Sequence, residues 1–240
     1  MAEALLIAIL GAESTGKTTL ARALAGALAA DTGLSAVCVG EWLRDWCDLE
    51  GRTPRADEQA AIATEQHRRI AAAAAAHPVV VCDTTALATA VYSRLLFGDD
   101  ALVAPAVALH RQFALTLLTA TDLPWVADGL QRDGPQVREP VDAMLRELLL
   151  AHRLPFAPIS GSGPARLASA IDAVAPLLRR HLAADDSGAT KHRADGLFSR
   201  LAARNAEPAA RDWVCLRCDD AACEHAQWRL RGAADGAKGS

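Results

Sequence analysis

The chain has 240 residues, of which 51% are hydrophobic and 22% charged, and its formal net charge is −4 at pH 7. This composition excludes a wholly disordered chain, a collagen and a small disulfide-stapled scaffold, and the length predicts one large domain or one domain with an appendage. The slightly acidic balance gives no electrostatic reason to expect nucleic acid as a partner.

The first half of the chain alternates short apolar runs with helical patterns. The run Ala4–Leu10 predicts a buried strand rather than a signal peptide, because no basic segment precedes it and a glycine-rich turn follows. A helix over Lys17–Ala30 and a strand over Ala36–Val39 complete a strand–helix–strand unit. The elements expected next are a long helix over Pro54–Ala76, a strand over Val79–Cys82 and a helix over Thr85–Phe97.

The second half continues this alternation. We expect, in order, a helix over about Ala101–Gln112, a strand over Leu115–Thr119, a polar loop over Pro124–Pro140, a helix over Val141–His152, a strand over Phe156–Ser160 and a last helix over Arg166–Leu182. Strands that alternate with helices predict an α/β fold with a five-stranded parallel sheet and helices on both faces. In such sheets, ligands bind at the carboxyl ends of the strands.

The composition changes after the last predicted helix. We interpret residues 1–182 as a P-loop domain, 183–212 as a linker with a short helix, 213–232 as a small Cys-rich appendage and 233–240 as a flexible tail. Six cysteines without a secretion signal favour a reducing compartment, so we expect a cytoplasmic protein. No run approaches the ~18–20 apolar residues of a membrane helix, and no membrane partner is expected.

The appendage contains Cys215, Cys218, Cys223 and His225. Thiolates and an imidazole at this spacing can build a tetrahedral Zn²⁺ site, and a metal would give so short a segment a reason to fold. Nearby acids could replace His225, and the alternative is three free thiols on a docked tail. The same tail is the candidate contact for a protein partner or a homo-oligomer.

The segment Gly11–Thr18 matches the pattern G-x-x-x-x-G-K-[ST] between a predicted strand and a predicted helix. Its glycines let backbone N–H groups surround a phosphate, and the following helix directs its positive end at the same anion. Lys17 can reach the β- and γ-phosphates, and Thr18 can ligate Mg²⁺. The residues expected to hold ATP here are Gly11, Glu13, Ser14, Thr15, Gly16, Lys17, Thr18 and Thr19.

Acidic residues follow two other predicted strands. Asp83 ends the run Val79–Cys82, where an acid can hold Mg²⁺ through water; it also suits a helix N-cap, and the two roles are compatible. Glu41 follows Ala36–Val39, where a carboxylate can orient an acceptor hydroxyl and accept its proton. Arg44 lies one turn further on and can pair with Glu41. The alternative for Glu41 is a solvated helix start.

The polar loop after the fourth predicted strand carries Trp125, Arg132 and Arg138. A mobile loop with arginines can close over a phosphate during its transfer, and the alternative is two solvated arginines. Trp125 could stack on a flat ring or anchor the loop to the core. This loop is therefore a candidate lid of a small-molecule kinase.

Taken together, several stretches resemble the ribosylnicotinamide kinase domain of NadR-type proteins. They are Gly11–Thr18, Glu41-x-x-Arg44, Cys82–Thr85, Tyr92 with Leu95–Gly98, Asp122–Leu130 and Leu154–Gly161, and they follow the order of the family. The chain departs from the family pattern at Trp42-Leu43, where an aromatic and then a small residue are expected. It shows neither a helix-turn-helix nor an adenylyltransferase portion, so we expect neither of those activities.

The resemblance implies a P-loop kinase that uses ATP and Mg²⁺ to phosphorylate the 5′-hydroxyl of nicotinamide riboside, which yields nicotinamide mononucleotide. It further implies that Ser160–Arg166 lies near adenine, so Arg166 joins the residues expected to bind ATP. The expected catalytic residues are Lys17, Glu41, Asp122, Arg132 and Arg138, and the expected acceptor residues are Glu41, Arg44, Tyr92, Asp122, Trp125 and Asp128.

Two other functions remain open at this point. The protein could be a nucleotide-dependent P-loop switch or ATPase whose Cys-rich tail docks a partner, or it could be a kinase for another nucleoside. A switch hydrolyses ATP slowly and needs no acceptor, so acceptor-dependent formation of ADP distinguishes it from both kinases.

Overall fold

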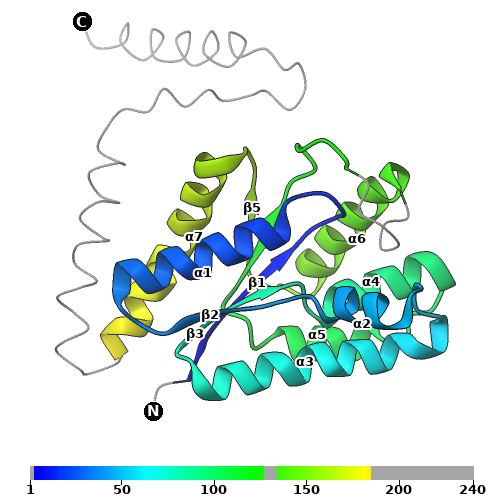
Figure 1. Cartoon of the computed structure of the whole chain (residues 1–240), viewed down its shortest axis with the longest axis horizontal. Helices are drawn as coiled ribbons and strands as arrows, with labels where there is room; N and C mark the ends of the chain where they lie inside the picture. The colour runs from blue at the N-terminus through cyan, green and yellow to red at the C-terminus, as the bar shows by residue number, and fades with distance from the viewer. Residues whose placement is uncertain (1–2, 127–133, 185–240) are drawn as a thin grey trace, which may run out of the picture. The chain divides into compact units, whose positions relative to one another are not determined.

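The apolar run near the N-terminus forms the central strand of a parallel sheet. In our computed structural model, which describes residues 3–126 and 134–184, β1 (Leu5–Leu10) is buried at every residue. It pairs with β3 (Val79–Asp83) on one side and with β4 (Leu115–Thr119) on the other. β2 (Ala36–Val39) and β5 (Phe156–Ile159) form the edges, so the strand order is β2-β3-β1-β4-β5 (Figure 1).

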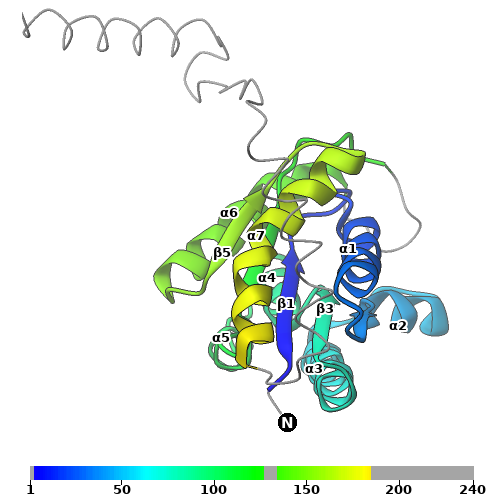
Figure 2. The ribbon, with the colours of Figure 1, turned by 90° about the vertical axis from the view of Figure 1, so that its left-hand side faces the viewer.

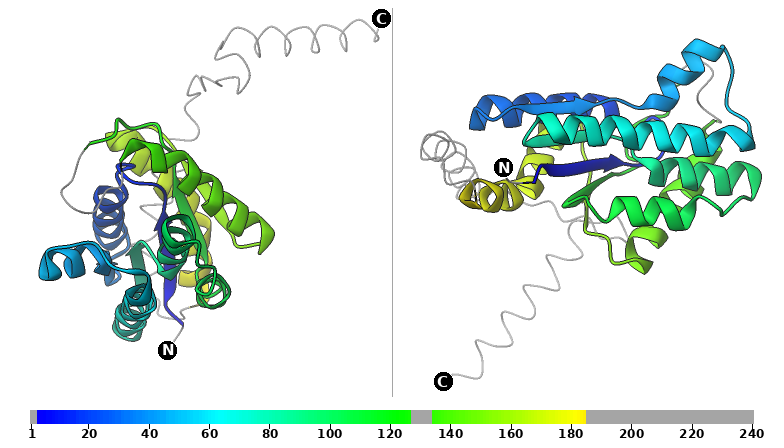
Figure 3. Two further views of the ribbon diagram at one scale, coloured as in Figure 1. Left: turned by 90° about the vertical axis from the view of Figure 1, so that its right-hand side faces the viewer. Right: turned by 90° about the horizontal axis from the view of Figure 1, so that it is seen from below.

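Helices connect the strands and cover both faces of the sheet. They are α1 (Lys17–Thr32), α2 (Trp42–Glu50), η1 (Ala56–Glu58), α3 (Gln59–Ala76), α4 (Ala86–Phe97), α5 (Val103–His110), η3 (Pro135–Val137), α6 (Arg138–Ala151) and α7 (Gly163–Ala184). α1 packs on β2 and β3, and α7 packs on β4 and β5 beside α1. Figures 2 and 3 show these two helices on one face, with α3, α4 and α5 on the other.

The core lies between the sheet and the α3–α4–α5 layer. Small residues of α4 and Ala63 of α3 pack there with Leu145 and Leu149 of α6. Each large aliphatic side chain that is fully buried in this way stabilises the fold by roughly 1.5–3 kcal/mol. The tight packing fixes α3 and α4 relative to each other, and both helices reach the carboxyl edge of the sheet.

The predicted α/β fold of the P-loop class, with its five parallel strands, is confirmed. The expected long helix begins at Gln59 rather than Pro54, because Glu58 accepts hydrogen bonds from Arg52 and from the Arg55 backbone and holds a separate short turn, η1. The helix expected from Val141 begins three residues earlier.

Several expectations lie outside the described residues. They are the roles of Asp128 and Arg132, the linker, the appendage with Cys215, Cys218, Cys223 and His225, and the tail. Of the helices within 3–126 and 134–184, none combines the length and apolarity of a bilayer-spanning segment.

Candidate active site

The phosphate loop lies between β1 and α1 and has a backbone that only particular residues can adopt. Gly11 has φ +150°, and a Cβ atom added there would lie 2.1 Å from Oγ1 of Thr119. Ser14 has φ +54° although it is not glycine, and Gly16 begins α1 with φ +76°. Strained positions of this kind gather at ligand-binding sites.

Hydroxyl groups fix the base of the loop to the sheet. Thr15 Oγ1 donates to the Ala12 carbonyl at 2.8 Å and lies 2.7 Å from Thr119 Oγ1, and both threonines are fully buried. Thr119 Oγ1 lies 3.1 Å from the Leu10 carbonyl. Lys17 Nζ donates to the Ala12 carbonyl at 2.8 Å. These contacts within the protein fix the shape of the loop, which lowers the entropic cost of binding an anion.

A cavity of about 670 Å³ opens beside this loop. Its volume is that of a small-molecule site, and most such sites measure roughly 300–1,000 Å³. The phosphate loop, α2, the α2–α3 connection and α4 form its walls. The lining residues are Gly11, Glu13, Ser14, Thr15, Gly16, Lys17, Thr18, Thr19, Arg22, Glu41, Leu43, Arg44, Cys47, Thr53, Pro54, Gln59, Thr84, Ala88, Tyr92, Leu96 and Phe97.

Most of the expected site residues share this cavity. The predicted phosphate-binding residues line it together with Glu41, Arg44 and Tyr92. They come from three separate parts of the sequence, and only the fold brings them to one space. Their individual roles stay predictions, but the sequence had grouped residues that the structure also groups.

Glu41 is one of two carboxylates that line the cavity, and the other is Glu13 of the phosphate loop itself. Glu41 is the N-cap residue of α2 and is partly exposed to the cavity but enclosed by protein on its other sides. Burial raises the pKa of Glu41, and Asp83 and Glu13 raise it further, while Lys17 and Arg44 lower it. A raised pKa makes a carboxylate a stronger base, which suits it to accept a proton from a hydroxyl.

A buried amide fixes the backbone on both sides of Glu41. Gln66 of α3 is 2% exposed; its Oε1 accepts from the Trp42 backbone N–H at 2.6 Å, and its Nε2 donates to the Gly40 carbonyl at 3.2 Å. Arg69, one turn further along α3, places its guanidinium 3.9 Å from the centre of the Trp42 ring. The β2–α2 junction is therefore held by α3, and the position of Glu41 depends on that helix.

The end of β3 fits a role in holding Mg²⁺. Asp83 is 1% exposed, and its Oδ1 has no hydrogen-bond partner among the described residues; the same holds for Oγ1 of Thr84. Thr84 also has φ +72°, which is unusual for a β-branched residue. Within 3–126 and 134–184, no three His, Cys, Asp or Glu side chains form a metal site by themselves. The oxygens of Thr18 and Asp83 therefore suit an ion that arrives with the phosphates.

Arg166 and Asp122 form a clamp under the phosphate loop rather than part of the cavity wall. Arg166 is 4% exposed and donates to the carbonyls of Thr15 at 3.0 Å and Ala120 at 3.1 Å, and to that of Gly161. It also donates to Asp122 Oδ1 at 2.8 Å, while Asp122 Oδ2 accepts from the Gly161 N–H at 2.5 Å. Both carboxylate oxygens of Asp122 are thus engaged, so Glu41 is the better placed candidate base.

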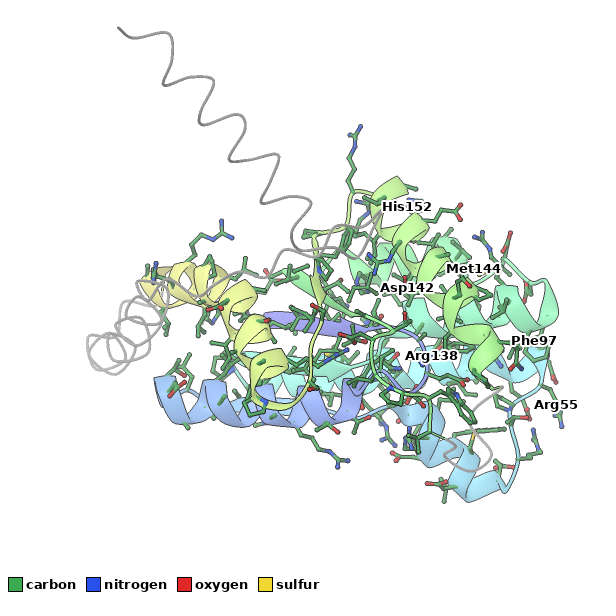
Figure 4. All side chains as sticks on the ribbon, turned by 90° about the horizontal axis from the view of Figure 1, so that it is seen from above. Arg55, Phe97, Arg138, Asp142, Met144 and His152 are labelled. Carbon is green, nitrogen blue, oxygen red and sulfur yellow. The ribbon has the colours of Figure 1, made fainter. Side chains whose placement is uncertain are left out.

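The segment after β4 lies against the phosphate loop. Ser14 Oγ is 2.9 Å from the carbonyl and 3.1 Å from the backbone nitrogen of Val126. Arg138, at the start of α6, donates to the carbonyls of Thr121 and Leu123 at 2.9 and 2.8 Å (Figure 4). Arg138 therefore holds the backbone of this segment and, like Trp125, is absent from the cavity lining.

Several residues that line or support the cavity belong to no predicted site, and Gln59, Gln66 and Cys47 are among them. Gln59 and Gln66 read as ordinary polar residues of a long helix, and their seven-residue spacing on one face was the signal that could have revealed them. Cys47 belongs to no motif in the sequence; it is buried and also lines the cavity.

Comparison with known proteins places this geometry in context. A family model described as "AAA domain" matches residues 6–166. Among solved structures, a NadR protein in complex with NR is 23% identical, with a TM-score of 0.58 over 72% of this chain and 51% of that one. A NadR protein in complex with NAD and AMP-PNP is 22% identical, with a TM-score of 0.58 over 72% of this chain and 49% of that one.

A thymidylate kinase from Ehrlichia chaffeensis is 15% identical, with a TM-score of 0.52 over 73% of this chain and 100% of that one. A search of curated proteins returns no match. The chain spans about half the length of the NadR structures. These likenesses show a fold shared with P-loop kinases, and at that level the resemblance to the NadR kinase domain is confirmed.

Proposed function

The chain belongs to the AAA domain family, and on that premise we propose that it is a kinase that transfers phosphate from ATP to the 5′-hydroxyl of nicotinamide riboside. The observation that carries the proposal is the cavity, which continues from Lys17 past Glu41 to Tyr92. An ATPase or a switch needs only the phosphate half of such a space. The other half, walled by α2 and α4, has the size and lining for an acceptor.

The chemistry follows from the charges along the cavity. The backbone N–H groups of the phosphate loop and Lys17 hold the β- and γ-phosphates. Mg²⁺, when bound, neutralises phosphate charge, and Thr18 with Asp83 would hold it. Glu41 orients the acceptor hydroxyl in line with the γ-phosphate and accepts its proton. Arg44, on the first turn of α2, offsets negative charge beside Glu41 as phosphate is transferred.

Two observations favour a nucleoside as the acceptor. Tyr92, Leu96 and Phe97 give the far part of the cavity an apolar and partly aromatic lining, which suits a flat ring. A NadR structure of the same fold contains NR. In this proposal Trp125, whose neighbour Val126 contacts Ser14 through its backbone, makes a second contact to the ring. Arg132 contacts the phosphate that is transferred.

The acceptor assignment is tested with a panel. Purified protein is incubated with Mg-ATP and, in separate reactions, nicotinamide riboside, nicotinic acid riboside, thymidine and thymidine monophosphate, and the products are identified by mass. We expect nicotinamide mononucleotide as the main product. Preferential phosphorylation of thymidine or its monophosphate would show that the acceptor is a different nucleoside or nucleotide, and the assignment as a kinase would stand. Lys17→Ala serves as the inactive control.

A further inference from the structure

A buried amide in the acceptor half of the cavity has no role in the chemistry above. Gln59, the first residue of α3, is 3% exposed and lines the cavity. Its side chain makes no hydrogen bond to another described residue, in contrast to Gln66, whose amide makes two. Its nitrogen and oxygen are not among the side-chain atoms sealed in the protein without a partner, so the amide faces the cavity. A ligand that fills the cavity removes water from this amide, and an amide left there without a partner is costly. The ligand therefore has to supply the partner of Gln59.

The position of Gln59 relative to Glu41 can be measured along α3. Gln59 and Gln66 are seven residues apart, which puts them on one face of the helix at an axial separation of about 10 Å. Gln66 holds the backbone on both sides of Glu41. Gln59 therefore lies roughly one nucleoside length from the level of the candidate base. A ligand whose hydroxyl is at Glu41 would bring its ring to Gln59.

Many of the residues that α2, α4 and the α2–α3 connection contribute to the cavity are apolar or aromatic. They are Leu43, Cys47, Pro54, Ala88, Tyr92, Leu96 and Phe97, with Arg44, Thr53 and Thr84 as polar neighbours. Figure 4 labels Phe97 at the end of α4 and Arg55 in the segment just before Gln59. Phe97 and Pro54, the residue before Arg55, both line the cavity. A side-chain amide in a largely apolar wall orients a ring and selects for its hydrogen-bonding edge, because an analogue without that edge leaves the protein amide unpaired.

We propose that Gln59 is a specificity-determining residue that recognises an amide or imide edge on the acceptor's ring. Its Nε2 donates to the ring substituent's carbonyl, and its Oε1 accepts from the substituent's N–H. The carboxamide of nicotinamide offers both groups. This inference rests on the proposed kinase function and adds to it that the site selects acceptors by a neutral donor–acceptor pair, and not by ring shape alone.

The test compares two acceptors that differ only at that edge. Nicotinamide riboside carries a carboxamide, whereas the riboside of 3-acetylpyridine keeps the carbonyl and lacks the N–H. For the wild type we expect kcat/KM to be about tenfold higher for nicotinamide riboside, the size of one hydrogen bond lost in a buried site. Gln59→Leu should lower kcat/KM for nicotinamide riboside and reduce the tenfold preference to less than about twofold, with the KM for ATP unchanged.

Two further variants make the result decisive. Gln59→Glu keeps the size of the side chain and its accepting oxygens, so it can still be tested if Gln59→Leu does not fold. It loses the donated hydrogen bond and should also weaken binding of nicotinamide riboside. Gln112→Leu changes an exposed glutamine just after α5 that does not line the cavity, and it should leave the preference at its wild-type value. Wild-type turnover with an unchanged preference in both Gln59 variants would overturn the assignment of Gln59 alone. Absence of turnover with every acceptor would overturn the proposed function and this inference with it.

Discussion

Replacement of Arg166 by methionine should destabilise the protein and weaken nucleotide binding together. Methionine retains the buried aliphatic stem and removes the guanidinium, which donates to the carbonyls of Thr15, Ala120 and Gly161 and to the carboxylate of Asp122. Removing one partner of a buried ion pair costs about 3–5 kcal/mol. Asp122 is 34% exposed, so water can hydrate the orphaned carboxylate, and we take the low end of that range.

A loss of about 3 kcal/mol corresponds to a fall of roughly 6–12 °C in the thermal midpoint for a chain of this size. The assay is thermal and urea denaturation at pH 7, with Arg68→Met as the control. Arg68 is 67% exposed and pairs with Glu65 on the helix surface, so its loss should cost less than about 0.5 kcal/mol. Equal midpoints for the two variants would refute the clamp.

The same clamp predicts a pH dependence. Partial burial raises the pKa of Asp122, but the hydrogen bonds from Arg166 and the Gly161 N–H outweigh it, and the pKa is lowered. A carboxyl with a lowered pKa stabilises the fold above its unfolded pKa, about 3.9, and loses that contribution as the pH falls through the folded value. Asp122→Asn should therefore flatten the acid side of the stability curve. An acid limb identical to that of the wild type would contradict this.

Four further substitutions test the site. Lys17→Ala should abolish turnover and leave the midpoint of the nucleotide-free protein within about 2 °C of the wild type, because Lys17 acts on phosphate; wild-type rates would exclude a role in transfer. Glu41→Gln should lower kcat by about 10²–10⁴ and raise the midpoint at pH 7, because burial raises the pKa of Glu41 and its ionised form opposes folding; a lowered midpoint would contradict this. Gln66→Leu should lower the free energy of unfolding by about 1–3 kcal/mol, because the β2–α2 junction loses two hydrogen bonds. It should also lower kcat more than it alters the KM for ATP, and equal effects on kcat and KM would favour a merely structural role. Gly11→Ala should abolish ATP binding in calorimetry, because its Cβ would lie 2.1 Å from Thr119 Oγ1, and unchanged affinity would show that the loop can yield.

The parallel sheet and the phosphate loop could be predicted from the sequence because their signals are local. β1 is an unbroken apolar run, and the glycines and Lys17 follow it within one motif. Glu41 could be found for the same reason, as an acid at the end of a strand. Each of these residues can be recognised from its own neighbours in the chain, although the contacts that hold Glu41 in place come from α3.

The supporting contacts could not be predicted, because each joins segments that are far apart. Arg166 reaches Thr15 across 151 positions, and Gln66 reaches Gly40 across 26. An acid such as Asp122 at a strand end looks like a catalytic group until the buried arginine that engages it is visible. The local sequence pattern shows that a polar residue follows a strand. The residue that hydrogen-bonds to it becomes visible only when α3 and α7 are packed on the sheet.

The most direct test of the kinase measures ADP and nicotinamide mononucleotide in the same reaction. With Mg-ATP and nicotinamide riboside, we predict that the two products form in a ratio of one to one and that ADP formation falls to a small background when the riboside is omitted. Transfer of phosphate to an acceptor requires this coupling. ADP formation at the same rate with and without an acceptor, for every member of the panel, would contradict the account and leave a nucleotide-dependent switch or ATPase.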